Sequence, residues 1–353
     1  MRKLPNVLGA LVFLCSSIVS GQTATDKKIH EWWNERPVGR PANNPNAQKL
    51  PLIAVHGNRF VDPQGVPVLF RGVSIADPDK ISAEGHWNRD LFVKLSQMGV
   101  HLVRIPVHPV AWRERTPREY LTLLDQAVEW CTDLGMYVDI DWHSIGNLET
   151  GLFQDPMYDT SKQETFNFWR TIAIHFAGNH TVAFFELFNE PTTFSNKLGP
   201  VSWDDWKRTN EELIALIRAF DTEKIPLVAG FDWAYDLTPL RQSPIAAAGI
   251  GYVTHPYPMK RTKPWEPKWE EDFGFAAGQY PMVATEIGFD GQTGAQEDGY
   301  GPAIIQYLES KGISWLAWCF DPEWGPRLIS SWDTFALTDS GEFFHQAMSG
   351  KVK

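Results

Sequence analysis

Cysteine is scarce in this sequence, with three residues in a chain of 353. One of them, Cys15, lies in an apolar run close to the N-terminus, which leaves Cys131 and Cys319 for the body of the chain. Two cysteines cannot form the disulfide framework that stabilises many small exported domains. We therefore predict that both are free and mostly buried, and that a hydrophobic core holds the fold together.

Long apolar runs are also missing, since the longest, Val7–Val19, is too short to cross a bilayer as a stable anchor. Two basic residues precede it and small residues follow it, which predicts a signal peptide over residues 1–21 and a secreted or periplasmic protein. Two alternatives are open. The run is a buried N-terminal helix, or Cys15 carries a lipid anchor, although Phe13-Leu14 is a poor match to the small residues that such anchors need. Asn179-His180-Thr181 fits a glycosylation sequon, whose use depends on the host.

Positive charge is in deficit, because 32 Lys and Arg stand against 43 Asp and Glu, a formal net charge of −11. No basic cluster occurs, so nucleic acid is not an expected partner. The His-x-x-x-His and His-x-x-Glu-His pairings typical of metal sites are also missing. We therefore expect a monomer that uses neither a metal nor another cofactor.

Tryptophan, by contrast, is abundant, with 16 residues. In an acidic chain with an export signal, this excess indicates flat apolar surfaces on which sugar rings can stack. The candidates for the walls of a cleft are Trp87, Trp112, Trp142, Trp203, Trp265 and Trp324. Each of them is equally well explained as a core residue.

Residues 22–50 are polar and contain three prolines, and we expect a leader that lies along the surface of one catalytic domain, residues 51–353. A β-hairpin is predicted at the start of this domain, because Ile53–Phe60 and Val66–Val73 flank an Asp62–Gly65 turn. No repeat, low-complexity tract or linker to a second domain follows.

Short apolar strands alternate with amphipathic helical segments such as 119–134, 163–176 and 206–220. The predicted strands are Leu69–Ser74, Leu102–Val107, Tyr137–Trp142, Ala183–Asn189, Leu227–Phe231, Gly251–His255, Met282–Ile287 and Ser314–Phe320. Strands that alternate with helices pair in parallel, and eight such units close into a (β/α)8 TIM barrel. An open doubly wound sheet is the alternative, but no Gly-rich phosphate loop follows an early strand.

Two glutamates mark the predicted active site. Glu190 ends the fourth strand region, and Glu286 lies in the seventh strand. The carboxyl ends of barrel strands share one face, so the two side chains can meet across the mouth. Glycoside cleavage needs one protonated and one ionised carboxyl group, and mutual repulsion favours this division. A separation of about 5–5.5 Å is expected if the anomeric configuration is retained.

Six short motifs occur in an order and spacing that resemble glycoside hydrolase family 5. They are Val103-Arg104-Ile105-Pro106, Asp141-Trp142-His143, Asn189-Glu190-Pro191, His255-Pro256-Tyr257, Thr285-Glu286 and Trp315-Leu316-Ala317-Trp318. The hairpin before Arg71-Gly72-Val73-Ser74 also resembles that family's entry into the barrel. The resemblance implies a retaining β-glucanase of the cellulase type.

The resemblance also implies a role for each matched residue. Glu190 matches the family's acid/base and Glu286 its nucleophile. The matched residues around the substrate are Arg104, His143, Asn189, His255, Tyr257 and Trp318. By the same resemblance, the fixed charge of Arg104 keeps Glu286 ionised, and Trp318 forms the platform under the sugar.

The resemblance also implies specific roles for five residues around the two acids. Tyr257 would donate a hydrogen bond to the nucleophile, and Asn189 would bind the 2-hydroxyl of the sugar. His143 and His255 would line the same subsite. Trp233, in the loop after the fifth strand, resembles the tryptophan that cellulases of this family place on the aglycone side.

Alternatives remain for several of these assignments. Arg104 is also explained as a structural ion-pair partner of Glu186, and both histidines as core residues. The matched residues are shared by glucanases and mannanases, so β-mannan is the alternative to β-1,4-glucan, and the 318–324 stretch departs from the commonest cellulase ending. A carbohydrate-binding protein without catalysis is the alternative of another class, although both acids and the arginine are present.

Overall fold

The computed structural model describes residues 45–290 and 299–351. The predicted signal peptide and most of the predicted leader therefore lie outside the described residues. Within the described ranges, no helix is long and apolar enough to span a bilayer.

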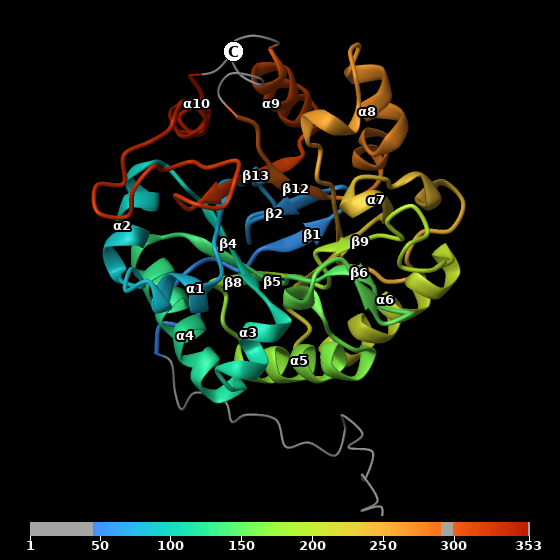
Figure 1. Ribbon diagram of the computed structural model, residues 1–353, viewed down its shortest axis with the longest axis horizontal. Helices are drawn as coiled ribbons and strands as arrows, with labels where there is room; N and C mark the ends of the chain where they lie inside the picture. The colour runs from blue at the N-terminus through green and yellow to red at the C-terminus, as the bar shows by residue number, and fades with distance from the viewer. Residues whose placement is uncertain (1–44, 291–298, 352–353) are drawn as a thin grey trace, which may run out of the picture.

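Eight parallel strands close into a barrel at the centre of the molecule, and helices surround it (Figure 1). In order around the barrel they are β3 (Arg71–Ile75), β4 (Leu102–Val107), β5 (Tyr137–Trp142), β8 (Val182–Glu186), β10 (Ile225–Ala229), β11 (Gly251–Val253), β12 (Met282–Ile287) and β13 (Ser314–Phe320). The order in space is the order in the chain, and the last strand pairs with the first. The predicted TIM barrel is confirmed.

The helices follow the strands, as the alternating pattern predicts. They are α1 (Pro78–Ala83), α2 (Arg89–Gln97), α3 (Pro109–Glu114), α4 (Pro117–Leu134), α5 (Lys162–His175), α6 (Trp203–Arg218), α7 (Phe231–Ala234), α8 (Glu266–Asp272), α9 (Tyr300–Lys311) and α10 (Asp339–Met348), with short 3-10 turns η2 (Pro156–Tyr158), η3 (Thr238–Arg241), η4 (Pro258–Lys260) and η5 (Gly274–Gly278). The three predicted helical segments correspond to α4, α5 and α6. Side-chain caps define two of the starts, since the hydroxyls of Ser161 and Ser202 accept hydrogen bonds from backbone N–H groups of α5 and α6.

Four strands have the predicted bounds, namely β4, β5, β12 and β13. The fourth predicted strand, Ala183–Asn189, is wrong at its end, because β8 stops at Glu186. The chain then leaves the barrel wall and forms a short strand β9 (Glu190–Pro191), which pairs with β6 (Ile145–Asn147) in a small sheet completed by β7 (Leu152–Phe153). Glu190 therefore lies in this outer sheet at the barrel mouth.

The predicted N-terminal hairpin is present, but its turn is different. Strands β1 (Ala54–His56) and β2 (Arg59–Val61) are antiparallel and connect through Gly57 and Asn58, with Gly57 at φ +59°. Glycine takes this conformation without steric cost, so the chain reverses inside the first predicted arm. The Asp62–Gly65 turn also forms, but it is followed only by an isolated bridge between Val61 and Pro67.

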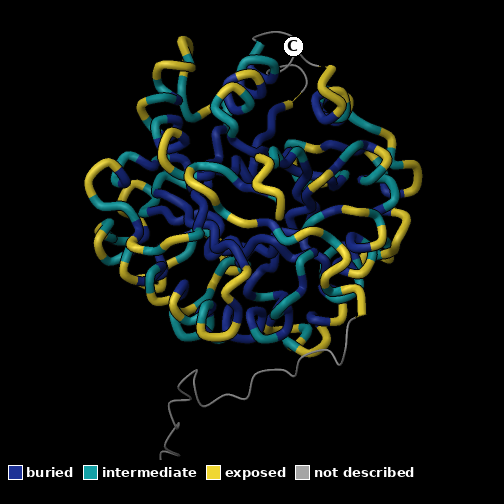
Figure 2. The backbone as a smooth tube through the Cα atoms, turned by 180° about the vertical axis from the view of Figure 1, so that it is seen from behind, coloured by how far each residue is buried: buried dark blue, intermediate teal, exposed yellow. Residues whose placement is uncertain are grey.

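The hairpin closes the N-terminal end of the barrel. Phe60 of β2 packs edge-on against Phe184 of β8, with ring centroids 4.9 Å apart, and against Phe70 at 6.3 Å. These rings belong to a buried cluster with Leu102, Leu227, Val253, Val283 and Leu316 from the barrel strands. A larger cluster lies between barrel and helices, so the buried backbone in Figure 2 runs through the centre and the exposed backbone through the loops.

The two cysteines of the body of the chain are buried and free, as predicted. Asn179 of the sequon is also buried, with 6% of its surface exposed, and its Oδ1 accepts a hydrogen bond from the N–H of Thr181. A glycan cannot be attached to a side chain in this position unless the segment is modified before it folds.

The close approach of β3 and β4 gives a test of the barrel. A Cβ at Gly72 would lie 1.9 Å from the carbonyl oxygen of Leu102, whereas a Cβ at Gly278 would meet nothing within 4 Å. We expect Gly72→Ala to lower the free energy of unfolding by about 3 kcal/mol or more, because strands must separate. Gly278→Ala is the control and should change it by less than about 0.5 kcal/mol. Urea denaturation measures both, and a Gly72→Ala variant as stable as the control would contradict this packing.

Candidate active site

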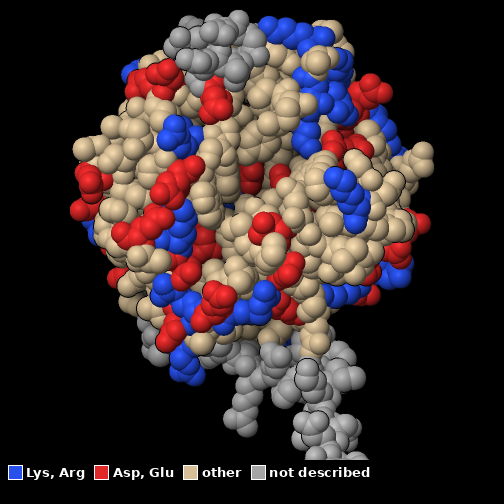
Figure 3. Space-filling view, in the orientation of Figure 1, with Lys and Arg blue, Asp and Glu red and all other residues tan. Residues whose placement is uncertain are grey.

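The predicted catalytic pair meets at the C-terminal mouth of the barrel. Glu190 on β9 and Glu286 on β12 are 9% and 4% exposed. One carboxylate oxygen of each lies within 4.8 Å of the other and of a ring nitrogen of His255. Such a short distance between carboxylate oxygens is nearer to the arrangement of retaining glycosidases than to the separation of about 6.5–9.5 Å between the acids of inverting ones. Figure 3 shows acidic side chains at the floor of a hollow in the centre of this face.

Both oxygens of Glu286 are held by fixed donors. The Nη1 of Arg104 donates to Oε1 over 2.8 Å, and the hydroxyl of Tyr257 donates to Oε2 over 2.7 Å. Burial, together with the charges of Glu286 and Glu190, raises the pKa of the Tyr257 hydroxyl well above its usual range, so it stays a donor. The arrangement holds Glu286 in one orientation, with both of its oxygens accepting hydrogen bonds.

Arg104 is fully buried and binds two further carboxylates. Its Nε and Nη2 donate to the two oxygens of Glu186 over 2.7 and 3.0 Å, and Nη2 lies 3.0 Å from Asp141. Burial alone would lower the pKa of the guanidinium, but Asp141, Glu186 and Glu286 outweigh it and raise the pKa well above its usual value. Arg104 therefore pairs both with Glu186 and with Glu286, the two partners that the sequence suggested for it.

Glu190 lies in a different environment from Glu286. Its Oε1 is 2.8 Å from Nδ1 of His255, and within the described part of the chain no guanidinium forms an ion pair with it. Burial raises the pKa of Glu190, His255 opposes this shift, and the charge of Glu286 adds to it. The two carboxyl groups thus lie in different environments. Glu286 accepts hydrogen bonds from two fixed donors, whereas the pKa of Glu190 is raised, which favours its protonated form.

Asn189 precedes Glu190 in the chain, and only the oxygen of its side-chain amide has a hydrogen-bond partner among the described residues. Its Oδ1 accepts a 2.6 Å hydrogen bond from Nη2 of Arg104, which orients the side chain. Its Nδ2 is buried and has no hydrogen-bond partner among the described residues. A buried donor without a partner is costly, and a hydroxyl of a bound ligand would satisfy it.

His143 and Trp318 form one wall of the site. Nδ1 of His143 lies 2.6 Å from Asp141, and the imidazole stacks on the Trp318 indole with centroids 5.4 Å apart and planes 3° apart. Burial, with the charges of His108, Arg104 and His255, lowers the pKa of His143 well below its usual value, so the ring is neutral. Trp324 continues this wall, since its ring lies 6.3 Å from that of Trp318 and 14° from parallel.

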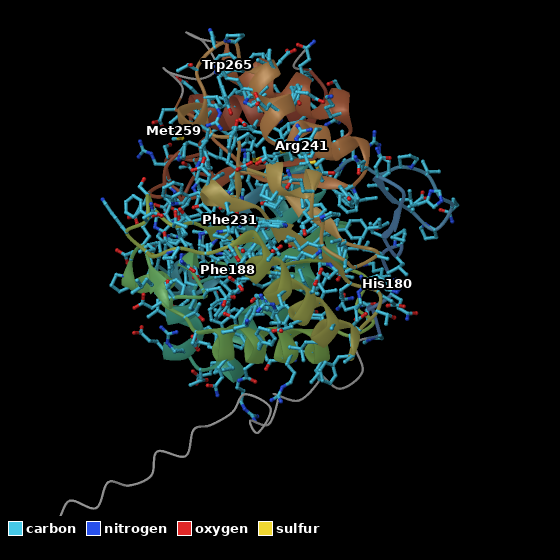
Figure 4. All side chains as sticks on the ribbon, turned by 90° about the vertical axis from the view of Figure 1, so that its right-hand side faces the viewer. His180, Phe188, Phe231, Arg241, Met259 and Trp265 are labelled. Atoms are coloured by element: carbon cyan, nitrogen blue, oxygen red, sulfur yellow. The ribbon has the colours of Figure 1, made fainter. Side chains whose placement is uncertain are left out.

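Trp233 lies next to Glu190 in a cavity at the mouth of the barrel. It lines a cavity of about 500 Å³ with Glu190, Asp232, Tyr257, Met259 and Lys260. Its Nε1 donates to Gln154 over 2.8 Å, and the ammonium of Lys260 lies 4.7 Å from its ring centroid. Met259 is 78% exposed at the rim, far from His180 at the hairpin end (Figure 4).

The structure thus brings all nine predicted site residues to one mouth of the barrel. It also shows which of the tryptophans proposed as cleft walls belong to the core. Trp112 and Trp142 are core residues at 4% and 0% exposure. Trp265 stacks on Trp269, with planes 8° apart. Sequence reasoning did not assign Met259 and Lys260, which lie in η4 just after Tyr257, and their position in the chain next to a matched motif was the available signal.

Glu190, His255 and Glu286 are also the one group in the described ranges whose ligand atoms are close enough to hold a metal ion. Arg104 and Tyr257 already donate to both oxygens of Glu286, and a guanidinium opposes a second cation at the same carboxylate. The donor set therefore fits acid–base chemistry better than metal binding.

The environment of His255 links stability to pH. Burial alone would lower its pKa, but Glu286, Glu186 and Glu190 outweigh burial and raise the pKa from 6.5 to about 9. The folded state therefore binds the proton more tightly, and this stabilisation is complete below pH 6.5 and lost as the pH rises through 9. We expect the free energy of unfolding to fall in that window by on the order of 3 kcal/mol, as urea denaturation at several pH values would measure.

His255→Asn should remove most of this pH dependence, while His56→Asn, on an exposed strand of the hairpin, should keep it. The same pH dependence in His255→Asn and in the wild type would contradict the linkage.

The chain matches the model of the family described as Cellulase (glycosyl hydrolase family 5) over residues 61–323. Among curated proteins, it is 29% identical over 235 residues to Endoglucanase A of Butyrivibrio fibrisolvens, covering 63% of this chain and 49% of that protein. It is 24% identical over 314 residues to an endoglucanase of Clostridium saccharobutylicum, covering 84% and 65%. The chain thus spans between about half and two thirds of the length of these relatives.

Among solved structures, the chain is similar to the native form of a β-glucanase from Saccharophagus degradans, with 44% identity, a TM-score of 0.86 and coverage of 91% of this chain and 99% of that one. The same β-glucanase in complex with cellotetraose matches with 43% identity, a TM-score of 0.86 and coverage of 92% and 100%. The family match extends over most of the barrel and includes both glutamates. The chain therefore belongs to glycosyl hydrolase family 5.

Proposed function

We propose that the chain is a retaining endo-β-1,4-glucanase, with Glu190 as acid/base and Glu286 as nucleophile. The observation that carries this proposal is the pair of buried carboxyl groups within 4.8 Å, held in two different environments. Arg104 and Tyr257 favour the ionised form of Glu286, while burial raises the pKa of Glu190. Glycoside cleavage with retention requires this division of roles.

In the first step, Glu286 attacks the anomeric carbon and forms a covalent glycosyl ester. The bond to the leaving oxygen breaks, and that oxygen takes the proton of Glu190. The leaving sugar occupies the side of Glu190 on which the Trp233 cavity lies. The retained sugar lies over Trp318, where a flat aromatic face can stack on its ring.

In the second step, Glu190 is a carboxylate and acts as the base. It takes a proton from water while the water oxygen attacks the anomeric carbon and the ester bond to Glu286 breaks. The free Nδ2 of Asn189 is placed to donate to the 2-hydroxyl of the bound sugar, a contact that strengthens as positive charge develops on the ring.

The comparisons support a glucan as the substrate. The relatives are named endoglucanases, and the similar structure from Saccharophagus degradans is a β-glucanase with a cellotetraose complex. The unusual 318–324 stretch carries Trp324 along the wall and does not interrupt the cavity.

A panel of polysaccharides tests the substrate. We expect reducing sugar to be released from soluble β-1,4-glucan and mixed-linkage β-glucan at a rate at least about 100-fold above that from mannan, because a difference of about 3 kcal/mol in the transition state is typical of selective contacts. Glu190→Gln is the control for background. Faster release from mannan would make the chain a mannanase, and release from neither would contradict hydrolysis.

Azide rescue tests the roles of the two acids. In Glu190→Ala, an activated aryl glycoside still glycosylates Glu286, but no base activates water, so azide should restore turnover and yield the β-glycosyl azide. In Glu286→Ala, azide fits the cavity left by the carboxylate and attacks directly, which should yield the α-azide. Proton NMR of the products distinguishes the two. Exchanged configurations would reverse the assignment of Glu190 and Glu286.

Export to the cell surface or beyond is part of this proposal, since a polymeric glucan does not cross a membrane. The apolar run at Val7–Val19 and the small residues after it support cleavage before Gln22. A mature protein that retains Met1 at its N-terminus would contradict it.

A further inference from the structure

The hydrogen bonds around His255 determine which of its nitrogens carries a proton. Nδ1 lies 2.8 Å from Oε1 of Glu190, and Nε2 lies 2.9 Å from Oγ1 of Thr285. Thr285 in turn lies 3.1 Å from Oε1 of Glu186. All four groups are buried, so these contacts are not exchanged for contacts with bulk water.

Glu186 can only accept hydrogen bonds. Both of its oxygens receive N–H donors from Arg104, over 2.7 and 3.0 Å. Burial opposes its ionisation, but Arg104 and then His255 outweigh burial and lower the pKa of Glu186 to about 2. An ionised carboxylate has no proton to offer, so the single hydroxyl proton of Thr285 is donated to Glu186. With its proton donated to Glu186, the oxygen of Thr285 can only accept in its contact with Nε2 of His255.

We propose that Thr285 is a positioning residue that fixes the proton of His255 on Nε2 and so leaves Nδ1 of the neutral ring as an acceptor facing Glu190. This inference rests on the proposed function, because it assigns to Glu190 the role of acid/base. The hydroxyl of Thr285 acts through His255 and touches no reacting atom.

The strand geometry permits this role. Successive side chains of a regular strand point to opposite faces, yet Thr285 and its neighbour Glu286 both face the barrel interior. The register between β12 and β13 shifts between Ala284 and Ile287, and such an irregularity re-aims side chains. The site thus gains two inward groups from consecutive residues.

Charged and titratable groups surround His255 on every side. They are Glu190 on β9, Glu286 on β12, Glu186 on β8, Arg104 on β4, and His143, Tyr158, Tyr257 and Lys260 from the loops around the mouth. The nearest are Glu190 at 2.8 Å from Nδ1, and Glu286 and Glu186 at 3.8 Å from Nδ1 and Nε2. Thr285 is a neutral group in direct contact with the ring, so it can select a tautomer without adding charge.

The consequence concerns the state of Glu190. While the pair retains its proton, that proton lies between Nδ1 of His255 and Oε1 of Glu190 and is available to the leaving oxygen. If the pair loses that proton and Nε2 stays protonated, the Glu190 carboxylate faces a lone pair, which is unfavourable. Thr285 therefore keeps the acid protonated to a higher pH. In the second step Glu190 takes a proton from water and the pair returns to its starting state.

Nitrogen NMR of histidine-labelled full-length protein tests the tautomer without any activity, and His255→Asn assigns the signals. We expect Nε2 to stay protonated between pH 6 and 10 in the wild type, while Nδ1 shows the shift of an unprotonated nitrogen once the ring is neutral. In Thr285→Val, which keeps the shape and removes the hydroxyl, the neutral ring should carry its proton on Nδ1. Protonated Nδ1 in the neutral wild-type ring would overturn the proposal.

The pH profile of kcat/KM on cellotetraose gives the second readout. In Thr285→Val, Nδ1–H can donate to ionised Glu190, so the basic limb should move to lower pH by about one unit. Thr285→Ser keeps the hydroxyl and should restore the wild-type limb. Thr254→Val is the matched control, because Thr254 adjoins His255 in the chain but its hydroxyl contacts the carbonyl of Tyr235 at 3.4 Å.

If the basic limb of the pH profile of kcat/KM does not move in Thr285→Val, or moves equally in Thr254→Val, the positioning role of Thr285 is overturned. A wild type that cleaves no glucan would instead contradict the proposed function, and the NMR result would still decide the tautomer. If Thr285→Val does not fold, the wild-type tautomer alone decides it.

Discussion

The guanidinium of Arg104 joins three strands of the barrel through Asp141, Glu186 and Glu286. A buried ion pair costs desolvation energy that is recovered only when the geometry is complete, and here each of the three nitrogens has at least one acceptor. One cation thereby sets the orientation of the proposed nucleophile, the amide of Asn189 and the ionisation of Glu186. Loss of Arg104 would leave Glu186 and Glu286 buried without their shared cation, so the network depends on this one side chain.

The groups of the site depend on local departures from a regular barrel. Strand β8 ends early, so Glu190 is presented by an outer sheet, and β12 changes register next to Glu286. Two short segments near the Trp233 cavity have left-handed backbone conformations. Residues 232–234 have φ values of 55, 57 and 57°, and residues 194–196 have φ values of 46, 53 and 69°. Phe194 packs on Trp233 with centroids 5.6 Å apart, so the strained turns support each other.

The barrel was predictable because its strands are buried on both faces and appear as short apolar runs between amphipathic helices. All six residues of β4 are buried, and its bounds were predicted to the residue. The end of β8 was not predicted, because Leu187 and Phe188 are as apolar as the strand before them. Only backbone hydrogen bonding distinguishes these two residues from the strand. The hairpin turn was misplaced because Gly57-Asn58 competes with a stronger Pro- and Gly-containing signal nearby. The site residues followed from motifs, but the double partnership of Arg104 and the contact between Lys260 and Trp233 depend on distances between loops that sequence spacing does not encode.

The rings of Phe60, Phe70 and Phe184 fill the N-terminal end of the barrel. This packing has a consequence for the covalent intermediate of the proposed reaction. With that end filled by packed rings, a molecule reaches Glu190 through the mouth of the barrel, where the Trp233 cavity lies beside the acid. Water and a second carbohydrate hydroxyl therefore compete for one position, and both would be activated by the same carboxylate. In the proposed reaction, tighter binding of a sugar beside Trp233 would therefore favour chain transfer over hydrolysis.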